Sequence, residues 1–329
     1  MIFNKKRSIT LVIISFILLF CTPGCDLFEV EFKDPRLEEL IRSEVGKPEG
    51  RLIKGDLSFL IFLDLSNQGI RDLSGLEHAD SLESLNLSGN SIVDLASLGK
   101  LRQLWELDLS DNYITELDSL NRVRNLQYLN LSGNYITDTS PLRRLENLLV
   151  LNLQNNMIRE ILPLGSLGTL LELNLSHNRI FDIGPLSTLE QLEDLHLNKN
   201  DIRDVDALAG LTNLWKLDLS GNMIKDISPL SDLENLKHLY LSHNRIDNLD
   251  PLKKLFNLRE LELVDNPVRN VSPLEQLYDL EHFSLNSNEV FNLDTLAELP
   301  LLKVYDQQGN PVMLNQFRES QEMPSSSNV

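Results

Sequence analysis

The sequence predicts an α/β solenoid, a curved array of about twelve repeats with a parallel β-sheet on the concave face and short helical or 3-10 returns on the convex face. Three observations predict it: a 22-residue period without insertions, leucines at fixed places in each period, and one asparagine per period. We assign the solenoid to residues 57–314. The recurring asparagines are Asn90, Asn112, Asn134, Asn156, Asn178, Asn200, Asn222, Asn244, Asn266, Asn288 and Asn310.

Each period has the same arrangement around its asparagine. In the repeat of Asn90, Leu85 and Leu87 alternate with polar residues, which predicts a short strand with both leucines facing inward. The asparagine follows where the chain turns, and its amide can satisfy backbone groups that the turn leaves unpaired. We therefore predict a structural asparagine ladder. In the last repeat, Tyr305 and Gln307 take the places of inward leucines, so we expect the solenoid to close there.

The ends of the array need caps because a single repeat cannot bury its own apolar face. We expect residues 34–56 to form a helical N-terminal cap, with Asp34 as the capping residue and Pro35 at the first helical position. Leu37, Leu40 and Ile41 give this helix an apolar face. Residues 315–329 read as a C-terminal tail.

The first 24 residues have the features of a signal peptide, because three basic residues precede an apolar stretch over residues 9–20. That stretch is shorter than the roughly 20 residues that a membrane-spanning helix needs. The segment from Thr22 to Cys25 resembles the lipobox of bacterial lipoproteins, which implies cleavage before Cys25 and its acylation. Residues 25–33 would then be an anchor and short linker in a membrane-anchored envelope lipoprotein. An ordinary signal peptide with an incidental cysteine is the alternative.

The repeat pattern LxxLxLxxNxIxxLxxLxxL is that of leucine-rich repeats. Its 22-residue length and the turn Asp226-Ile227-Ser228-Pro229-Leu230 resemble the internalin-like bacterial class, over about 250 residues. The resemblance implies a non-catalytic module of the adhesin or host-interaction type, which binds a partner protein on its concave face at the cell surface. A scaffold inside the envelope that binds one of the cell's own proteins is the alternative.

The composition narrows the choice of partner. Asp plus Glu outnumber Lys plus Arg by 49 to 30, and the net charge of −19 disfavours nucleic acid. It favours a protein with a basic patch. No Gly-rich phosphate loop interrupts the repeats and no nucleophile stands beside a base in an insertion, so we expect neither an enzyme nor a cofactor. We expect a monomer.

Outward side chains of the strands would form the concave face. The inner two columns are acidic, with Lys216 as the only lysine or arginine. Exposed aromatic groups among polar ones are typical binding anchors. Trp105 and Trp215 stand just beside the strands, and packing on the rim is the alternative for both. The candidate partner-binding residues are Phe62, Trp105, Tyr128, Trp215, His238, Tyr240, Glu260, Glu262 and His282.

Two further columns have a competing interpretation. Acidic residues stand four positions after most of the asparagines, as Asp94 does, and are replaced by Asn248, Asn270 and Asn292 in later repeats. This column could bind cations, but we expect it to accept backbone N–H groups. His238, Glu260 and His282 neighbour one another across three strands. Their two histidine backbones would be about 9.6 Å apart, twice the spacing of adjacent strands, so we predict no metal site there.

Overall fold

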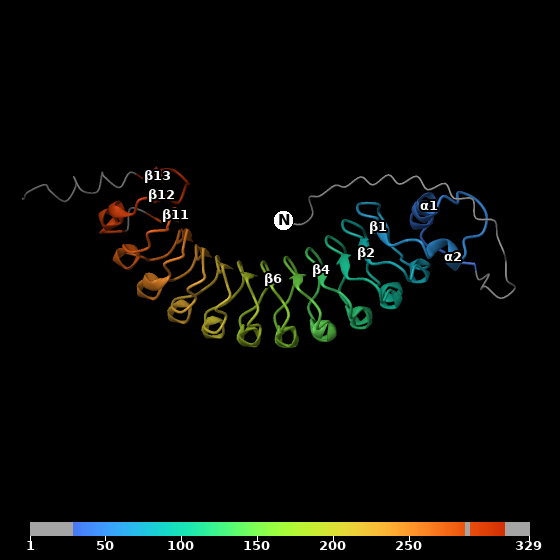
Figure 1. Ribbon diagram of the computed structural model, residues 1–329, viewed down its shortest axis with the longest axis horizontal. Coiled ribbons are helices and arrows are strands. Elements are labelled where there is room, and N and C mark those ends of the chain that lie inside the picture. Colours follow the sequence, from blue (N-terminus) through green and yellow to red (C-terminus); the bar gives the residue numbers. More distant parts are fainter. Residues whose placement is uncertain (1–28, 287–289, 313–329) are drawn as a thin grey trace, which may run out of the picture.

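A computed structural model of the 329-residue chain describes residues 29–286 and 290–312. The chain forms a crescent with strands along its concave side and short helices along its convex side (Figure 1). In these residues the sheet has 13 strands that follow one another in sequence order. The predicted solenoid is confirmed.

The parallel part of the sheet consists of three-residue strands, one for each repeat. Their bounds are β1 (Phe62–Asp64), β2 (Ser84–Asn86), β3 (Glu106–Asp108), β4 (Tyr128–Asn130), β5 (Val150–Asn152), β6 (Glu172–Asn174), β7 (Asp194–His196), β8 (Lys216–Asp218), β9 (His238–Tyr240), β10 (Glu260–Glu262), β11 (His282–Ser284) and β12 (Lys303–Tyr305). The last strand, β13 (Pro311–Val312), pairs antiparallel to β12.

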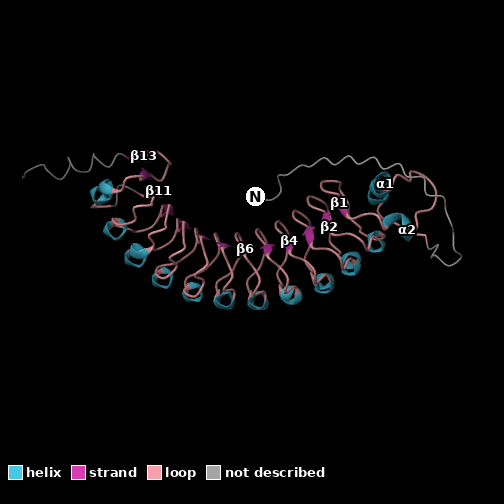
Figure 2. Cartoon of the chain, in the orientation of Figure 1, coloured by secondary structure: helices cyan, strands magenta, loops and turns pink. Residues whose placement is uncertain are grey.

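The returns are 3-10 helices on the convex side, while the two α-helices lie at the N-terminal end (Figure 2). The α-helices are α1 (Pro35–Glu44) and α2 (Lys54–Leu57). The 3-10 helices are η1 (Leu76–His78), η2 (Ala96–Lys100), η3 (Asp118–Arg122), η4 (Ser140–Arg144), η5 (Leu162–Ser166), η6 (Gly184–Thr188), η7 (Asp206–Leu208), η8 (Ser228–Leu230), η9 (Asp250–Lys254), η10 (Ser272–Leu274) and η12 (Leu293–Glu298).

Leucines fill the space between the sheet and the returns. From β1 to β11, each strand residue pairs with the residue 22 positions later on the next strand, as Leu85 does with Leu107. Equivalent side chains of neighbouring repeats therefore stack on one another. Leu85, Leu87 and Leu98 of one repeat are all buried. This contiguous apolar core fixes the strands, and it leaves their alternate side chains facing outward on the concave side.

The asparagine side chains link each repeat to the one before it. Asn112 Nδ2 donates to Leu109 O at 3.1 Å in its own repeat and to Leu87 O at 2.9 Å in the preceding one. Its Oδ1 accepts from Ile92 N at 3.0 Å. These bonds satisfy buried backbone groups that neither strand nor helix pairs. The asparagines that are buried in this way are Asn90, Asn112, Asn134, Asn156, Asn178, Asn200, Asn222, Asn244 and Asn266.

A second ladder, which the sequence reasoning missed, runs along the other end of the strands. Nine residues before several core asparagines, another asparagine donates Nδ2 to the carbonyl of a residue 23 positions earlier, as Asn125 does to Arg102 O at 2.9 Å. Its signal is a recurring asparagine just before the first leucine of each strand region. The members are Asn125, Asn147, Asn213, Asn235 and Asn257.

Asp34 ties the N-terminal cap to the first repeat. One carboxylate oxygen accepts from Arg36 N at 2.9 Å and Leu37 N at 3.3 Å, at the start of α1. The other accepts from Arg71 N at 2.7 Å. Burial opposes ionisation of Asp34, but the bonds from Arg71 and the other backbone N–H groups outweigh it and lower its pKa.

The last repeat differs from the prediction. Phe283 of β11 pairs with Val304, 21 residues later, so Val304 is the buried residue and Tyr305 faces outward. Burying the aliphatic Val304 in place of Tyr305 avoids the cost of burying a phenol hydroxyl in the core. Asn310 is therefore not a member of the ladder: it is exposed and lies in the turn to β13, where its backbone N–H donates to Asp306 Oδ1 at 2.8 Å.

Several predicted features lie outside the described residues, namely the signal peptide (1–24), Cys25, Asn288 and the tail (315–329). Among the residues that the structure describes, none of the helices has the length and apolar character needed to cross a bilayer.

Candidate functional site on the concave face

The concave face has two aromatic clusters, and Trp105 begins the first. This residue directly precedes β3, and its indole meets the Tyr128 ring of β4 edge-on, with 5.8 Å between ring centroids and 75° between planes. Both side chains are half-buried. A hollow of about 400 Å³ lies beside them, lined by Trp105, Glu106, Leu107, Asp108, Tyr128, Leu129, Asn130, Val150, Asn152 and Glu172.

The carboxylates of this hollow have only neutral partners. Glu106 Oε2 accepts from Ser84 Oγ at 2.7 Å, and Asp108 Oδ2 accepts from Asn130 Nδ2 at 3.1 Å. In the described part of the chain, neither they nor Glu172 form an ion pair with a lysine, arginine or histidine. Glu172 was absent from the predicted candidates, although its place six residues before Asn178 was a usable signal.

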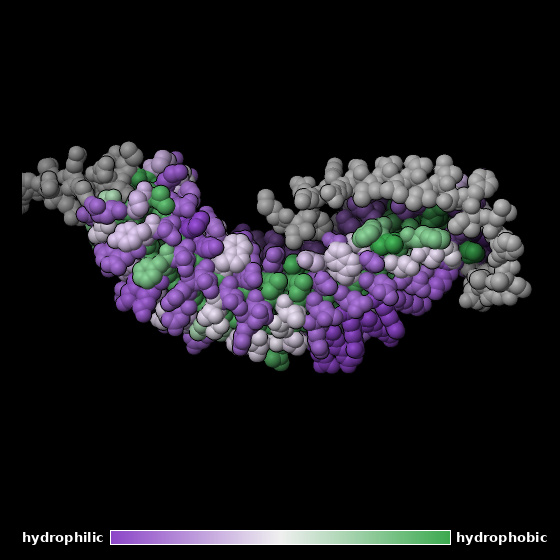
Figure 3. All heavy atoms as spheres, viewed as in Figure 1, coloured by the Kyte–Doolittle hydropathy of each residue, from purple (hydrophilic) through white to green (hydrophobic). Residues whose placement is uncertain are grey.

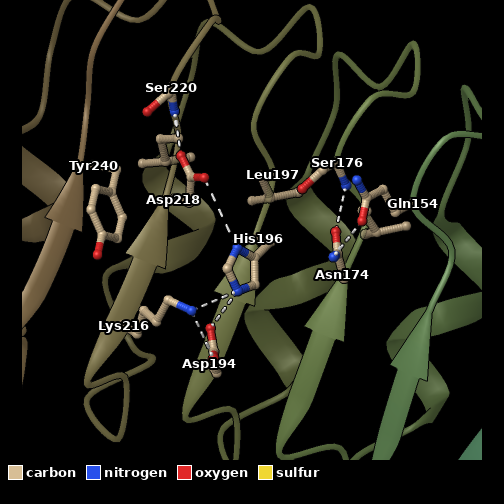
Figure 4. A network of polar contacts seen from close by, with 12 residues as sticks. Gln154, Asn174, Ser176, Asp194, His196, Leu197, Lys216, Asp218, Ser220 and Tyr240 are labelled. Carbon is tan, nitrogen blue, oxygen red and sulfur yellow. Dashed lines mark hydrogen bonds and ion pairs between the residues drawn. The ribbon is translucent and has the colours of Figure 1, made fainter. Parts of the chain in front are cut away.

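A polar network occupies the middle of the sheet, on β7 and β8 (Figure 4). Asp194 Oδ1 lies 2.9 Å from His196 Nε2, and its Oδ2 lies 3.4 Å from Lys216 Nζ. Asp218 Oδ2 is 3.9 Å from His196 Nδ1 on the other side of the imidazole. Sequence reasoning noted these residues separately but did not group them, although Lys216 stands one strand from Asp194.

The two carboxylates of this network stabilise the charge on His196 against repulsion from Lys216, whose Nζ lies 3.1 Å from His196 Nε2. The carboxylates of Asp194 and then Asp218 raise the pKa of His196 to about 9, so its imidazole is protonated at neutral pH. Burial opposes ionisation of Asp194, but its contacts with His196 and Lys216 outweigh this and lower its pKa. Two cations therefore share one carboxylate here, and the acidic groups are already compensated within the chain.

Trp215 begins the second aromatic cluster, five repeats beyond Trp105. Its indole meets the His238 ring edge-on, with centroids 5.7 Å apart and an angle of 79°. Glu260 Oε2 then accepts from Tyr240 Oη at 2.6 Å and lies 2.9 Å from His238 Nδ1. Burial opposes ionisation of Glu260, but the hydrogen bonds from Tyr240 and His238 outweigh it and lower the pKa of Glu260. Burial and the neighbouring Glu260 carboxylate raise the pKa of Tyr240.

The other three predicted candidates are spread out. Glu262 lies on β10, and burial together with repulsion from Glu260 and Asp218 raises its pKa. His282 lies beside Glu260 on the neighbouring strand, and its ring stacks on that of Tyr305 with 6.0 Å between centroids. Among the described residues, no group of three or more histidine, cysteine, aspartate or glutamate side chains is arranged to hold a metal ion.

Phe62 lies on β1, at the N-terminal end of the sheet and two strands before β3. It is 63% exposed, and its neighbours Phe59 and Ile61 are exposed too. The space-filling view shows apolar surface near this end, while most of the remaining visible surface is hydrophilic (Figure 3).

Two columns of Asp and Asn side chains accept hydrogen bonds from the backbone. Asp94 Oδ1 accepts from Ala96 N at 2.8 Å at the start of η2, as the structural interpretation predicts. Outward residues at the ends of the strands do the same: Asn86 Oδ1 accepts from Ser88 N at 3.0 Å and Asp218 Oδ1 from Ser220 N at 3.0 Å. His196 and Tyr240 replace this recurring Asp or Asn, which marks them as departures from the repeat's own needs.

Models of leucine-rich repeat families match much of the array. "Leucine Rich repeats (2 copies)" matches residues 124–166 and 212–254, "Leucine rich repeat" matches 168–224, and "Leucine Rich Repeat" matches 81–101. Together with the fold, these matches show that the chain contains leucine-rich repeats. No curated protein matches it closely enough to count as a relative.

Internalins are among the similar solved structures, as the repeat length and turn predict. The internalin inlF of Listeria monocytogenes is 27% identical, with a TM-score of 0.60 over 85% of this chain and 96% of that one. The functional domain of InlJ from Listeria monocytogenes shares the fold at 22% identity, with a TM-score of 0.67 over 83% of this chain and 66% of that one.

A receptor complex also shares the fold. The ectodomain of the Arabidopsis thaliana receptor kinase GASSHO1/SCHENGEN3, solved in complex with CASPARIAN STRIP INTEGRITY FACTOR 2, is 22% identical, with a TM-score of 0.62 over 78% of this chain and 36% of that one. The fold and its internalin-like neighbours indicate a protein-interaction module here.

Proposed function

We propose that this protein is a non-catalytic binding module displayed on a bacterial envelope, which holds a partner protein on its concave face. The observation that carries the proposal is the row of partly exposed aromatic and acidic side chains on one face of a sheet whose opposite face packs on the apolar core. Such a face presents anchors without the cost of ordering a loop.

The partner would carry a basic patch. Outward positions of β3, β7, β8 and β10 bring carboxylates to the same curved surface, and the net charge is −19. Complementary charge speeds encounter and disfavours acidic partners. Anchoring through an acyl chain on Cys25, which the lipobox resemblance implies, would hold the solenoid at a membrane surface.

Two variants of the full chain test whether the concave face binds. Glu172→Arg reverses a charge on β6, whereas Glu146→Arg makes the same change at an exposed site just after η4. A partner cross-linked to cells that make the wild type should be lost with Glu172→Arg and retained with Glu146→Arg. Equal retention by both variants would place binding elsewhere on the molecule.

Protease treatment of intact and lysed cells tests display. Cleavage on intact cells is expected for a surface binding module. Protection until lysis would replace the adhesin-type function by that of a scaffold inside the envelope.

A further inference from the structure

The hollow beside Trp105 and Tyr128 has a shape that follows from the order of side chains on four adjacent strands. Tyr128, Val150 and Glu172 occupy the same outward column on β4, β5 and β6, in register. The short Val150 side chain stands between two longer ones, so it forms an apolar floor. Glu106 and Asp108 on β3 close one side, and Glu172 closes the other.

The charge of the hollow is negative and lacks an internal counterion. Outward residues of β2 to β6 include Glu106, Asp108 and Glu172 but no lysine, arginine or histidine. Their neighbours on these strands are neutral, and the hydrogen bonds to Glu106 and Asp108 come from Ser84, Ser110 and Asn130. The central network on β7 and β8, by contrast, supplies its own two cations.

Aromatic rings complete the requirements of a cation site. The Trp105 and Tyr128 rings stand at 75° to one another beside the carboxylates. The faces of tryptophan and tyrosine attract a cation, and partly desolvated contacts of this kind contribute about 0.5–2 kcal/mol. The apolar stem of a lysine or arginine side chain would meanwhile pack on Tyr128 and Val150.

We propose that this hollow binds a lysine or arginine side chain from a basic segment of the partner protein. The inference rests on the proposed function and gives it a specific contact. The ammonium or guanidinium lies against Trp105 and Tyr128 with Glu106 and Asp108 beside it. Glu172 on β6 is about 14 Å from Glu106 on β3, which is three strand spacings. We therefore expect it to face the next basic residue of the same segment.

The experiment uses the two tryptophans of the chain as probe and control, because the sequence contains no others. The full-length protein in detergent is labelled with 5-fluorotryptophan and observed by fluorine NMR, and Trp105→Phe and Trp215→Phe assign the two signals. Short neutral-ended peptides with two central lysines, two arginines or two norleucines are titrated at about 10 mM ionic strength, where charges are weakly screened.

The lysine or arginine peptide should shift the Trp105 signal in a saturable way, while the Trp215 signal moves little. Whichever peptide binds more tightly identifies the preferred cation. Glu106→Gln combined with Asp108→Asn should weaken binding about tenfold, the effect of losing two partly exposed charge contacts. The norleucine peptide, which keeps the apolar stem without the charge, should leave both signals unchanged.

Equal shifts at both tryptophans, a norleucine peptide that binds as well, or an unmoved Trp105 signal would overturn the proposal. Failure of this cation site can be distinguished from failure of the proposed concave-face function. If Glu172→Arg still abolishes partner capture while the Trp105 signal stays unmoved, the concave face binds a partner but this hollow does not take a cation. If both tests fail, the concave-face function fails with it.

Discussion

Trp105 and Trp215 occupy equivalent positions five repeats apart, yet their surroundings differ in charge. Each indole meets the first outward ring of the following strand edge-on, Tyr128 at 5.8 Å and His238 at 5.7 Å. Around Trp215, however, Glu260 is paired with His238 and Tyr240. Around Trp105, the acidic groups have no cationic partner in the part of the chain that the structure describes.

This difference shows how one repeat geometry can serve two purposes. Where carboxylates find cations within the chain, as Asp194 does with His196 and Lys216, they stabilise the folded solenoid. Where they do not, the same charges remain for a partner. The Trp105 side of the face should therefore contribute more to binding, and the central strands more to stability.

The largest expected effect separates the two regions by stability. Asp194→Asn leaves His196 and Lys216 without their shared carboxylate, so we expect the free energy of unfolding to fall by about 2–3 kcal/mol. Glu106→Gln at the same outward position of β3 can keep its bond from Ser84 Oγ and should cost less than about 0.5 kcal/mol. Urea unfolding followed by circular dichroism measures both, and equal losses would refute the division.

The pH dependence of stability tests the same network. The pKa of His196 is raised in the folded state from 6.5 to about 9. Its contribution is therefore complete below about pH 6.5 and disappears as the pH rises through 9. Between these limits the wild type should lose about 1–2 kcal/mol more than His196→Gln, allowing for solvent screening of a partly exposed group. Parallel stability curves for the two proteins would contradict the assignment.

The regular part of the fold could be predicted because the same sequence pattern recurs in each repeat. The burial of Leu85, Leu87 and Asn90 follows from one period, and the equivalent residues are buried in the eight periods that follow it. The last repeat lacked that redundancy. Counting 22 residues placed Tyr305 inward, but the core takes Val304, since an aliphatic side chain is buried at lower cost than a phenol.

The candidate site was predictable only as a set of positions. The outward columns follow from the alternation of the strands, so the places of Tyr128 on β4 and Tyr240 on β9 could be predicted. Which side chains meet depends on rotamers and on charges one strand away. The register confirms that His238, Glu260 and His282 are neighbours, but the stacking of His282 on Tyr305 and the Asp194 network were not predicted.

Trp105→Ser and Trp215→Ser extend the comparison to binding. Both should leave the fold intact, since neither residue belongs to the buried core. We expect both to weaken partner binding, with about tenfold loss for Trp105→Ser and a smaller loss for Trp215→Ser, whose cluster is already paired internally. Titration calorimetry with the captured partner measures the ratio. A larger loss at Trp215 would reverse the roles of the two clusters.

The smallest expected effect concerns the rate of association. If uncompensated carboxylates steer a basic partner, the association rate of the wild type should fall as salt rises, because the Debye length shortens from about 30 Å at 0.01 M to about 10 Å at 0.1 M. Neutralising Glu106, Asp108 and Glu172 as amides should flatten this dependence. The control Asp218→Asn removes a charge from the network on β7 and β8, where His196 already faces it. Its salt dependence should lie between those of the wild type and the triple variant, because it removes one negative charge rather than three.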